Sequence, residues 1–287
     1  MTKYILVTGA NGQLGHELQN VLNQRDDITT YFTDVEELDI TNKESIHDFF
    51  KDLQIDYLVN CAAYTAVDKA EDDIDFCQKL NADSVKLLAE ACKEKGAKMI
   101  QISTDYVFNG ENDKPYLESD PPAPCSIYGI TKLEGEKNMQ ELLPDAIIVR
   151  TAWLYSPYGH NFVKTMLHLG KTRESLNVVN DQWGTPTYAL DLAHALIAII
   201  DAPHWEPGIY HYSNEGTTTW FDFAVSVHRH AGITSCAITP CSTAQYPTAA
   251  HRPRYSVLSK EKIKKTYKIS IPNWEESLKH CLQRIDK

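Results

Sequence analysis

Short apolar runs, rich in β-branched residues, alternate with amphipathic stretches through the first half of the chain. The runs have the length and composition of buried strands, which are typical of parallel sheets because helices cover both faces of such sheets. They predict five strands, at residues 4–8, 28–33, 57–61, 99–103 and 146–150.

The stretches between the predicted strands have the period of an amphipathic helix. Apolar residues recur on one helix face at Leu14, Leu18, Val21 and Leu22, and again at Val85, Leu88, Ala89 and Cys92. Strands and helices that alternate in this way are joined by right-handed crossovers. We therefore predict an α/β fold with a doubly wound parallel sheet of the Rossmann type, in which ligands bind at the carboxyl ends of the strands.

The second half of the chain loses this regular alternation. Residues 155–159 have the composition of a loop, whereas residues 189–200, 220–231 and 273–284 have the pattern of helices. These segments predict a smaller region that is interleaved with the sheet and covers the substrate. We predict a dinucleotide-binding domain of residues 1–152 plus about 188–212, and a substrate-binding region of about 153–187 plus 213–287.

The charge of the chain limits its ligands. The 287 residues include 28 basic and 39 acidic side chains, so the formal net charge is −11. Such a chain repels phosphate backbones and anionic lipid, and we expect a small-molecule ligand with no nucleic-acid or membrane partner. No apolar stretch approaches the roughly 20 residues of a membrane span, and the N-terminal run is too short for a signal peptide. We therefore expect a cytoplasmic protein.

Three glycines follow the first predicted strand and precede the first predicted helix, in the pattern Gly-x-x-Gly-x-x-Gly. Glycines at this place allow a tight turn, a close approach of backbone to a pyrophosphate, and close packing of the helix on the sheet. The helix N-terminus then offers free N–H groups to the phosphates. We predict that the cofactor contacts Gly9, Asn11, Gly12, Gln13, Leu14 and Gly15.

Asp34 follows the second predicted strand, 19 residues after Gly15. A carboxylate at this place accepts hydrogen bonds from the adenosine ribose and repels a 2′-phosphate, which favours NADH. An aspartate side chain can also rotate away, and an acidic residue after a strand is common in solvated turns. The expected cofactor is therefore NADPH or NADH.

Tyr128 and Lys132 lie one helical turn apart, so they share a helix face. A phenol with a pKa of about 10 is a poor acid or base at neutral pH unless a nearby ammonium group stabilises its phenolate. Lys132 is placed to do this and to bond the nicotinamide ribose. Ser103 and Thr104 end the fourth predicted strand, and the Thr104 hydroxyl can bond the substrate oxygen that receives the proton. We predict that Tyr128, Lys132 and Thr104 are catalytic.

Together these motifs resemble those of the extended short-chain dehydrogenase/reductase family. Within that family the chain is most similar to reductases of dTDP-linked 4-keto-6-deoxyhexoses, through residues 7–15, 60–68, 103–110, 128–135, 150–153, 181–187 and 252–256. The resemblance implies further cofactor contacts at Asp39, Ile40, Ala62, Ala63, Tyr64 and Ser103, besides Tyr128 and Lys132. It implies that the nucleotide-sugar is contacted by Thr65, Thr104, Asp105, Tyr106 and Trp153. Arg252 and Arg254, which flank Pro253, could hold a diphosphate in this acidic chain.

Other functions are compatible with such a fold. Nucleotide-sugar dehydratases of the resembled family carry an acidic residue directly after the aspartate of the strand-end motif, where this chain has Tyr106. Carbonyl reduction is therefore favoured over water elimination. The alternatives are an epimerase or dehydratase on another nucleotide-sugar, and a catalytically silent, dinucleotide-binding regulatory subunit.

The sequence predicts no metal site. The seven cysteines lack a Cys-x-x-Cys pair, which favours free buried thiols, and the eleven histidines lack a His-x-x-x-His spacing. Some members of the resembled family are dimers bridged by a divalent metal on glutamates, and Glu17 matches one such ligand. Residues 188–191 supply no second glutamate, although Asp191 is a shorter carboxylate. We expect no metal, and a monomer or weak homodimer.

Overall fold

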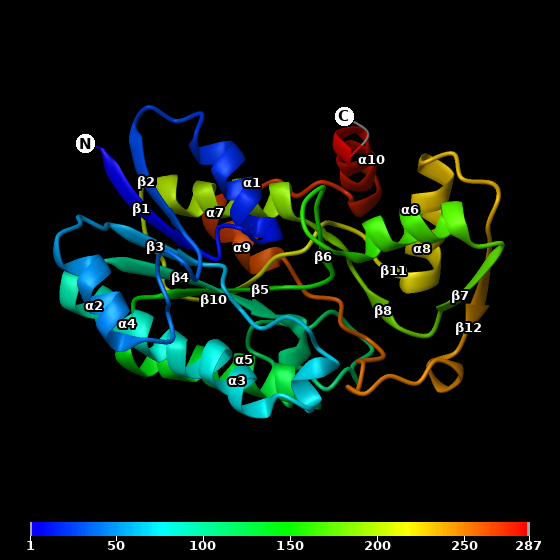
Figure 1. Cartoon of the computed structure of the whole chain (residues 1–287), viewed down its shortest axis with the longest axis horizontal. Helices are drawn as coiled ribbons and strands as arrows, with labels where there is room; N and C mark the ends of the chain where they lie inside the picture. The colour runs from blue at the N-terminus through cyan, green and yellow to red at the C-terminus, as the bar shows by residue number, and fades with distance from the viewer. Residues whose placement is uncertain (1, 286–287) are drawn as a thin grey trace.

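The central sheet is built from the apolar runs of the sequence. In the computed structural model, which describes residues 2–285, six strands pair in parallel in the order β10-β5-β4-β3-β1-β2 (Figure 1). Their bounds are β1 Lys3–Thr8, β2 Ile28–Thr33, β3 Tyr57–Asn60, β4 Lys98–Thr104, β5 Ile147–Thr151 and β10 Gly208–His211. This confirms the predicted doubly wound parallel sheet. The sequence pattern does not predict β10, because its four residues include glycine and histidine and form no apolar run.

The order of the strands reverses beside β1. The chain passes from β1 to β2 on one side and then returns to β3 on the other side of β1. In open α/β sheets ligands bind outside the carboxyl ends of the strands at such a reversal. A row of buried hydrogen bonds crosses these strand ends, from Thr8 Oγ1 to Asn60 Oδ1 at 2.6 Å and from Asn60 Nδ2 to Gln101 Oε1 at 2.7 Å. These bonds connect the ends of β1 and β3 to each other and to the middle of β4.

Helices cover both faces of the sheet. They are α1 Gln13–Leu22, α7 Ala189–Asp201 and α9 Glu261–Tyr267 on one face, and α2 Lys43–Lys51, α4 Ser84–Lys95 and α5 Ile127–Leu142 on the other (Figure 1). Side chains alternate along a strand, so β1 serves both layers. Ile5 and Val7 pack with α1 and α7, whereas Leu6 packs with α2 and α4. Each face thus has its own hydrophobic core.

The second half of the chain builds a further hydrophobic core, which we call the second core. Its centre includes Tyr155, Met166, Tyr188, Phe223 and Leu278, all buried. The elements around it are β6 Leu154–Tyr155, α6 Phe162–Thr172, β7 Ser175–Val179, β8 Trp183–Gly184, β9 Thr187–Tyr188, β11 Thr218–Thr219, α8 Trp220–His230, β12 Ala237–Cys241 and α10 Trp274–Ile285. Its strands pair two by two, as β6 with β9, β7 with β12 and β8 with β11. The helices predicted at 220–231 and 273–284 are α8 and α10 of this region, and the helix predicted at 189–200 is α7 of the sheet.

Short helical turns complete the described chain: η1 Lys69–Glu71, α3 Ile74–Gln78, the π-helical turn η2 Lys79–Asp83, η3 Asp105–Val107 and η4 Thr243–Gln245. The predicted loop at 155–159 begins instead within β6.

The division of the chain into two domains stays a prediction. It places α9 in the substrate-binding region, but α9 packs elsewhere. Ile263 and Tyr267 of α9 lie in the core of the sheet rather than in the second core. No helix among residues 2–285 is long and apolar enough to cross a membrane.

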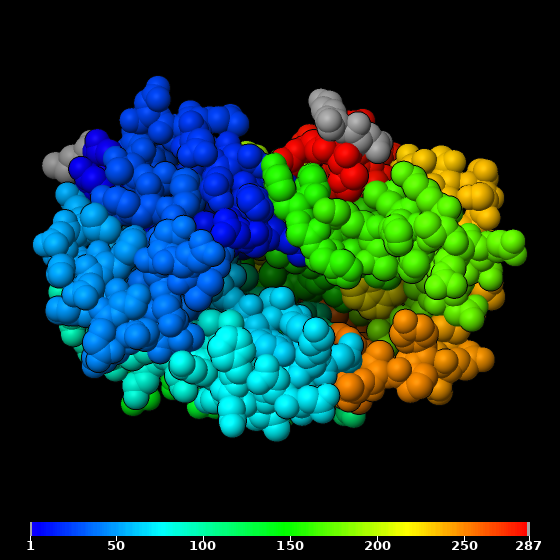
Figure 2. Space-filling view, viewed as in Figure 1, coloured from blue at the N-terminus to red at the C-terminus, as the bar shows by residue number. Residues whose placement is uncertain are grey.

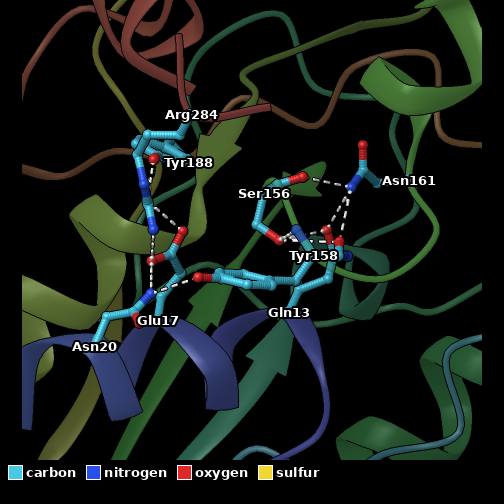
Figure 3. A network of polar contacts seen from close by, with 8 residues as sticks. All are labelled: Gln13, Glu17, Asn20, Ser156, Tyr158, Asn161, Tyr188 and Arg284. Atoms are coloured by element: carbon cyan, nitrogen blue, oxygen red, sulfur yellow. Dashed lines mark hydrogen bonds and ion pairs between the residues drawn. The ribbon is translucent and has the colours of Figure 1, made fainter. Parts of the chain in front are cut away.

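Helix α1 is fastened to the second core along one face (Figure 3). At its first turn, the Gln13 carboxamide accepts a hydrogen bond from Asn161 Nδ2 at 2.9 Å and donates one to the Leu154 carbonyl at 3.4 Å. One turn further on, the carboxylate of Glu17 is fully buried and accepts hydrogen bonds from Arg284 of α10 at 2.6 and 2.9 Å. The N-terminal helix and the C-terminal helix are therefore joined by one ion pair.

We expect Arg284→Met to lower the free energy of unfolding by about 3 kcal/mol, because it leaves the buried Glu17 carboxylate without its ion-pair partner. Arg25→Met is a matched control, since Arg25 forms its ion pairs at the surface with Asp27 and Asp201. That substitution should have a much smaller effect. Urea denaturation of the two variants measures both changes, and equal losses would contradict the prediction.

Candidate active site

A cleft of about 1080 Å³ opens at the carboxyl ends of β1, β3 and β4. In Figure 2 it is the hollow between the blue and cyan N-terminal half and the green segment of the second core. The predicted site residues that line it are Gly9, Gly12, Gln13, Leu14, Gly15, Asp34, Asp39, Ile40, Ala62, Ala63, Thr65, Ser103, Thr104, Asp105, Tyr106, Tyr128, Lys132, Trp153 and Arg252. Asn11 and Tyr64 do not line it.

The three glycines of the loop between β1 and α1 have different surroundings. Gly9 has a φ of +66°, and a side chain there would lie 2.6 Å from the backbone nitrogen of Ala62. A side chain on Gly15 would overlap the backbone of Gly9 and Ala10. A side chain on Gly12 would lie 3.2 Å from the Gly9 carbonyl oxygen and close to no other atom. Gly12 is also the N-cap of α1 and caps it with no side chain, so the N–H groups of the first turn are open to the cleft.

Asn11 contributes to the loop rather than to the cleft. Its backbone N–H donates to Asp34 Oδ2 at 3.0 Å, and the N–H of Val35 donates to Asp34 Oδ1 at 2.8 Å. The Asp34 carboxylate therefore fastens the end of β2 to the glycine loop while it lines the cleft. A sequence pattern does not show this bond, because it joins residues 23 positions apart.

Tyr64 is held outside the cleft by a residue that the sequence analysis missed. Its N–H donates to Asn81 Oδ1 at 2.9 Å, and Asn81 Nδ2 donates to the Tyr64 carbonyl at 3.2 Å. Asn81 is buried and belongs to the π-helical turn η2, a type of turn that is frequent at functional sites. The Tyr64 ring packs edge-on against Phe76, which does line the cleft. Asn81 thus positions the segment after β3.

Tyr128 reaches the strand ends because the first turn of α5 packs closely on η3. A side chain on Gly129 would overlap the Tyr106 carbonyl, so only glycine permits this approach. Helix α5 is capped by Ser126, whose hydroxyl accepts a hydrogen bond from the Gly129 N–H at 3.2 Å. Burial raises the pKa of Tyr128, and hydrogen bonding with Thr104 partly opposes that rise. Tyr128 and Thr104 are thus brought together as predicted.

Lys132 is buried, and its ammonium group donates to the Ile102 carbonyl at 2.7 Å. Burial lowers the pKa of Lys132 to about 8, although the negative charge of Glu136 opposes this. Hydrogen bonding with Thr104 is the leading influence that lowers the pKa of Tyr128, and a contribution from Lys132 stays a prediction. The Ile102 carbonyl, near the end of β4, holds the ammonium group close to the strand. The ammonium group nevertheless lines the same cleft.

A buried ion pair between Glu136 and Arg150 lies close to Lys132. Glu136 accepts hydrogen bonds from Arg150 at 2.9 and 2.6 Å, and from the Ser103 hydroxyl at 2.5 Å. Ser103 therefore lines the cleft while its hydroxyl group bonds to Glu136. The sequence analysis does not identify Glu136 or Arg150 as a pair, although Glu136 lies one helical turn after Lys132. Buried charges persist only when they are paired, so this pair holds β4, β5 and α5 in register.

The far wall of the cleft is aromatic. Trp153 has a φ of +49° and stacks on Trp220, with ring centroids 3.6 Å apart. A side chain on Gly184 would lie 2.6 Å from the Trp153 ring, so the indole is held from both sides. Trp220, the first residue of α8, also lines the cleft and was missed, because an aromatic residue on an amphipathic helix is typical of a core.

Asp105 is the buried acidic group of the cleft. Its Oδ1 accepts a hydrogen bond from the Thr104 hydroxyl at 3.1 Å, whereas Oδ2 has no partner among the described residues. Burial raises the pKa of Asp105 to about 6. A buried oxygen without a partner costs free energy, so its position in the cleft is consistent with a ligand hydroxyl that donates to it.

A parallel sheet with a glycine loop at its reversal point, and a tyrosine and lysine pair in the same cleft, define a dinucleotide-dependent oxidoreductase of the extended short-chain dehydrogenase/reductase type. The chain belongs to the family defined by the RmlD substrate binding domain, whose model matches residues 2–287. The predicted family and enzyme class are thereby confirmed.

Relatives with known names cover nearly the whole chain. The dTDP-4-dehydrorhamnose reductase of Escherichia coli (strain K12) is 42% identical over 294 residues, which span 98% of this chain and 97% of that protein. Solved structures of dTDP-4-dehydrorhamnose reductases from Clostridium acetobutylicum and Bacillus anthracis are 46% and 40% identical, each with a TM-score of 0.95. Each match covers 99% of this chain and 100% of the other, and the Bacillus anthracis structure is a complex with NADP.

Glu17 is the residue that matches a metal ligand of the resembled family. Its carboxylate forms an ion pair with Arg284, and both of its oxygens accept hydrogen bonds from that residue. Asp191 accepts from Asn214 at 2.7 Å and from Ser277 at 2.5 Å. Among residues 2–285, no group of three or more histidine, cysteine or acidic side chains could hold a metal ion. The expected independence from metal stays a prediction.

We expect dialysis against EDTA to leave both activity and sedimentation unchanged, because a divalent cation would need several free carboxylate oxygens and those of Glu17 are occupied. Activity assays and analytical ultracentrifugation, before and after dialysis, measure this. Loss of activity, or a dimer that dissociates on chelation and forms again with magnesium, would show that the prediction is wrong.

Proposed function

We propose that the protein reduces the C4 carbonyl of dTDP-4-dehydro-L-rhamnose to give dTDP-L-rhamnose, with NADPH or NADH as cofactor. The names of the relatives and the NADP complex of one of them support the substrate and the cofactor. The observation that carries the proposal is the position of Tyr128 beside Thr104, in the same cleft as the glycine loop.

The residues present fit a dinucleotide. Gly12 leaves backbone exposed at the N-terminus of α1, where the pyrophosphate would bind. Asp34, Asp39 and Ile40 would hold the adenosine end, and Lys132 the nicotinamide ribose. When bound, the nicotinamide supplies a hydride to carbon C4 of the sugar. The chain itself must then orient the carbonyl group and provide a proton.

Tyr128 is suited to donate that proton. Because burial raises its pKa, the phenol is protonated throughout the neutral range. The carbonyl oxygen becomes negative as the carbonyl carbon is reduced, and the proton passes from the Tyr128 hydroxyl to this oxygen. Thr104 stabilises the phenolate that remains through a hydrogen bond, and the charged form of Lys132 does so through its positive charge. Tyr128, Thr104 and Lys132 thus act as one acid–base group.

The alternatives have less support. A regulatory subunit without activity would not need Tyr128, Thr104 and Lys132 together at the cleft. A dehydratase needs an acidic group at position 106, whereas the Tyr106 hydroxyl accepts a hydrogen bond from Arg252 at 2.7 Å, and burial raises the pKa of Tyr106 to about 12. Identification of the product by mass spectrometry and NMR distinguishes reduction from epimerisation and from loss of water.

We expect Tyr128→Phe to reduce kcat by about 10²–10⁴-fold, because the ring stays while the proton donor is lost. NADPH binding should hardly change. Tyr31→Phe serves as a control, since Tyr31 lies on β2 and does not line the cleft. Turnover is followed by the absorbance of the reduced nicotinamide, and a Tyr128→Phe variant with nearly normal kcat would disprove the role of Tyr128.

Gly12→Val should abolish NADPH binding and leave folding intact, because its side chain would meet only the Gly9 carbonyl oxygen, at 3.2 Å, and would occupy the phosphate position. Gly15→Val should instead lower the melting temperature, since its side chain would overlap the backbone of the loop. Fluorescence titration with NADPH and thermal unfolding separate the two effects. If Gly12→Val binds NADPH normally, the glycine loop is only a turn.

A further inference from the structure

A polar bridge closes one edge of the cleft. Arg252 donates from Nη2 to Asp68 Oδ2 at 2.5 Å and from Nη1 to the Tyr106 hydroxyl at 2.7 Å. The Ala250 N–H donates to the other carboxylate oxygen of Asp68 at 3.1 Å. Asp68 precedes η1, in the first half of the chain, and in Figure 2 the orange segment that contains Arg252 lies against the cyan segment. A single carboxylate therefore holds both the backbone and the side chain of residues 250–252.

The segment after Arg252 is held equally firmly. Gly110 has a φ of +81°, and a side chain there would lie 2.5 Å from Pro253. The Tyr255 N–H donates to the Gly110 carbonyl at 3.1 Å, and the Trp183 N–H donates to the Arg254 carbonyl at 2.7 Å. The backbone around Arg252 is therefore fixed on both sides, and only its long side chain needs a further restraint.

Arg252 lines the cleft and has donor groups to spare. A guanidinium group carries five N–H donors in a planar fork, and the bonds to Asp68 and Tyr106 use two of them. Such a fork matches the oxygens of a phosphate group in geometry and charge. Arg254, by contrast, is exposed and does not line the cleft. Of the two arginines expected to hold a diphosphate, only Arg252 therefore lies where it could contact a ligand in the cleft.

We propose that Asp68 is a positioning residue that, together with Tyr106, holds the Arg252 guanidinium at the cleft to bind the diphosphate of the nucleotide-sugar. The identity of this ligand rests on the proposed function. An arginine that is already ordered loses less conformational freedom when the diphosphate binds, so the affinity is greater. Asp68 does not touch the ligand in this arrangement and acts only through Arg252.

The test is the substitution Asp68→Asn in the full chain, which keeps the size of the side chain and removes its charge. We expect KM for the nucleotide-sugar and the Kd for thymidine diphosphate to rise about tenfold, as for loss of a hydrogen bond between charged groups. The kcat and the Kd for NADPH should stay the same. Asp72→Asn is the matched control, since Asp72 lies at the other end of η1 and is exposed.

A double variant shows whether Asp68 acts through Arg252. Arg252→Met should weaken thymidine diphosphate binding at least as much as Asp68→Asn does, and the combined variant should bind no more weakly than Arg252→Met. Arg252→Lys retains the positive charge but lacks the planar fork, so it should also weaken binding and gives a second measure if Asp68→Asn folds poorly.

Three results would overturn the inference: tighter binding of thymidine diphosphate by Asp68→Asn, equal losses in Asp68→Asn and Asp72→Asn, or strictly additive losses in the double variant. The first would make Asp68 a competitor of the diphosphate, and the second would show that its effect does not depend on the contact with Arg252. Binding of thymidine diphosphate needs no turnover. Normal binding without reduction of the keto-sugar would therefore count against the proposed function and not against the role of Asp68.

Discussion

The parallel pairing of β1 with both β2 and β3 is the constraint on which the rest of the structure depends. It forces the chain to leave β1 at the point where the strand order reverses, so the loop to α1 must turn tightly beside the end of β3. Gly9 lies against Ala62 at this point, where a side chain has no room. The same crowding directs the N-terminus of α1 to the cleft, and the buried bonds of Asn60 join the end of β3 to its two neighbouring strands.

The chemistry of the cleft depends on charges that the fold has buried. Glu136 and Arg150 neutralise each other beneath α5, and Glu136 opposes the loss of charge that burial imposes on Lys132. Without that carboxylate, a lysine in this position would be neutral more often at neutral pH. The proposed acid–base group at Tyr128 is therefore supported by an ion pair that does not itself line the cleft.

Polar contacts on two sides of the cleft join its walls. On one side, Gln13 and Glu17 of α1 bond to residues around the second core, as Figure 3 shows. On the other side, Asp68 bonds to Arg252. Each contact links segments far apart in the chain, so the two ends of the cleft are parts of one connected structure.

The sequence alone determined the features that local pattern controls. Apolar runs and amphipathic periods specified five strands of the sheet and the helices α1 and α4, and the glycine spacing and the interval from Tyr128 to Lys132 predicted where a dinucleotide and an acid–base group would lie. Only the tertiary structure decided which distant side chains meet: Asp34 with the glycine loop, Asn81 with Tyr64, and Asp68 with Arg252. The reason is physical, because periodicity reports which face of a single element is buried, whereas a hydrogen bond between elements depends on how they pack.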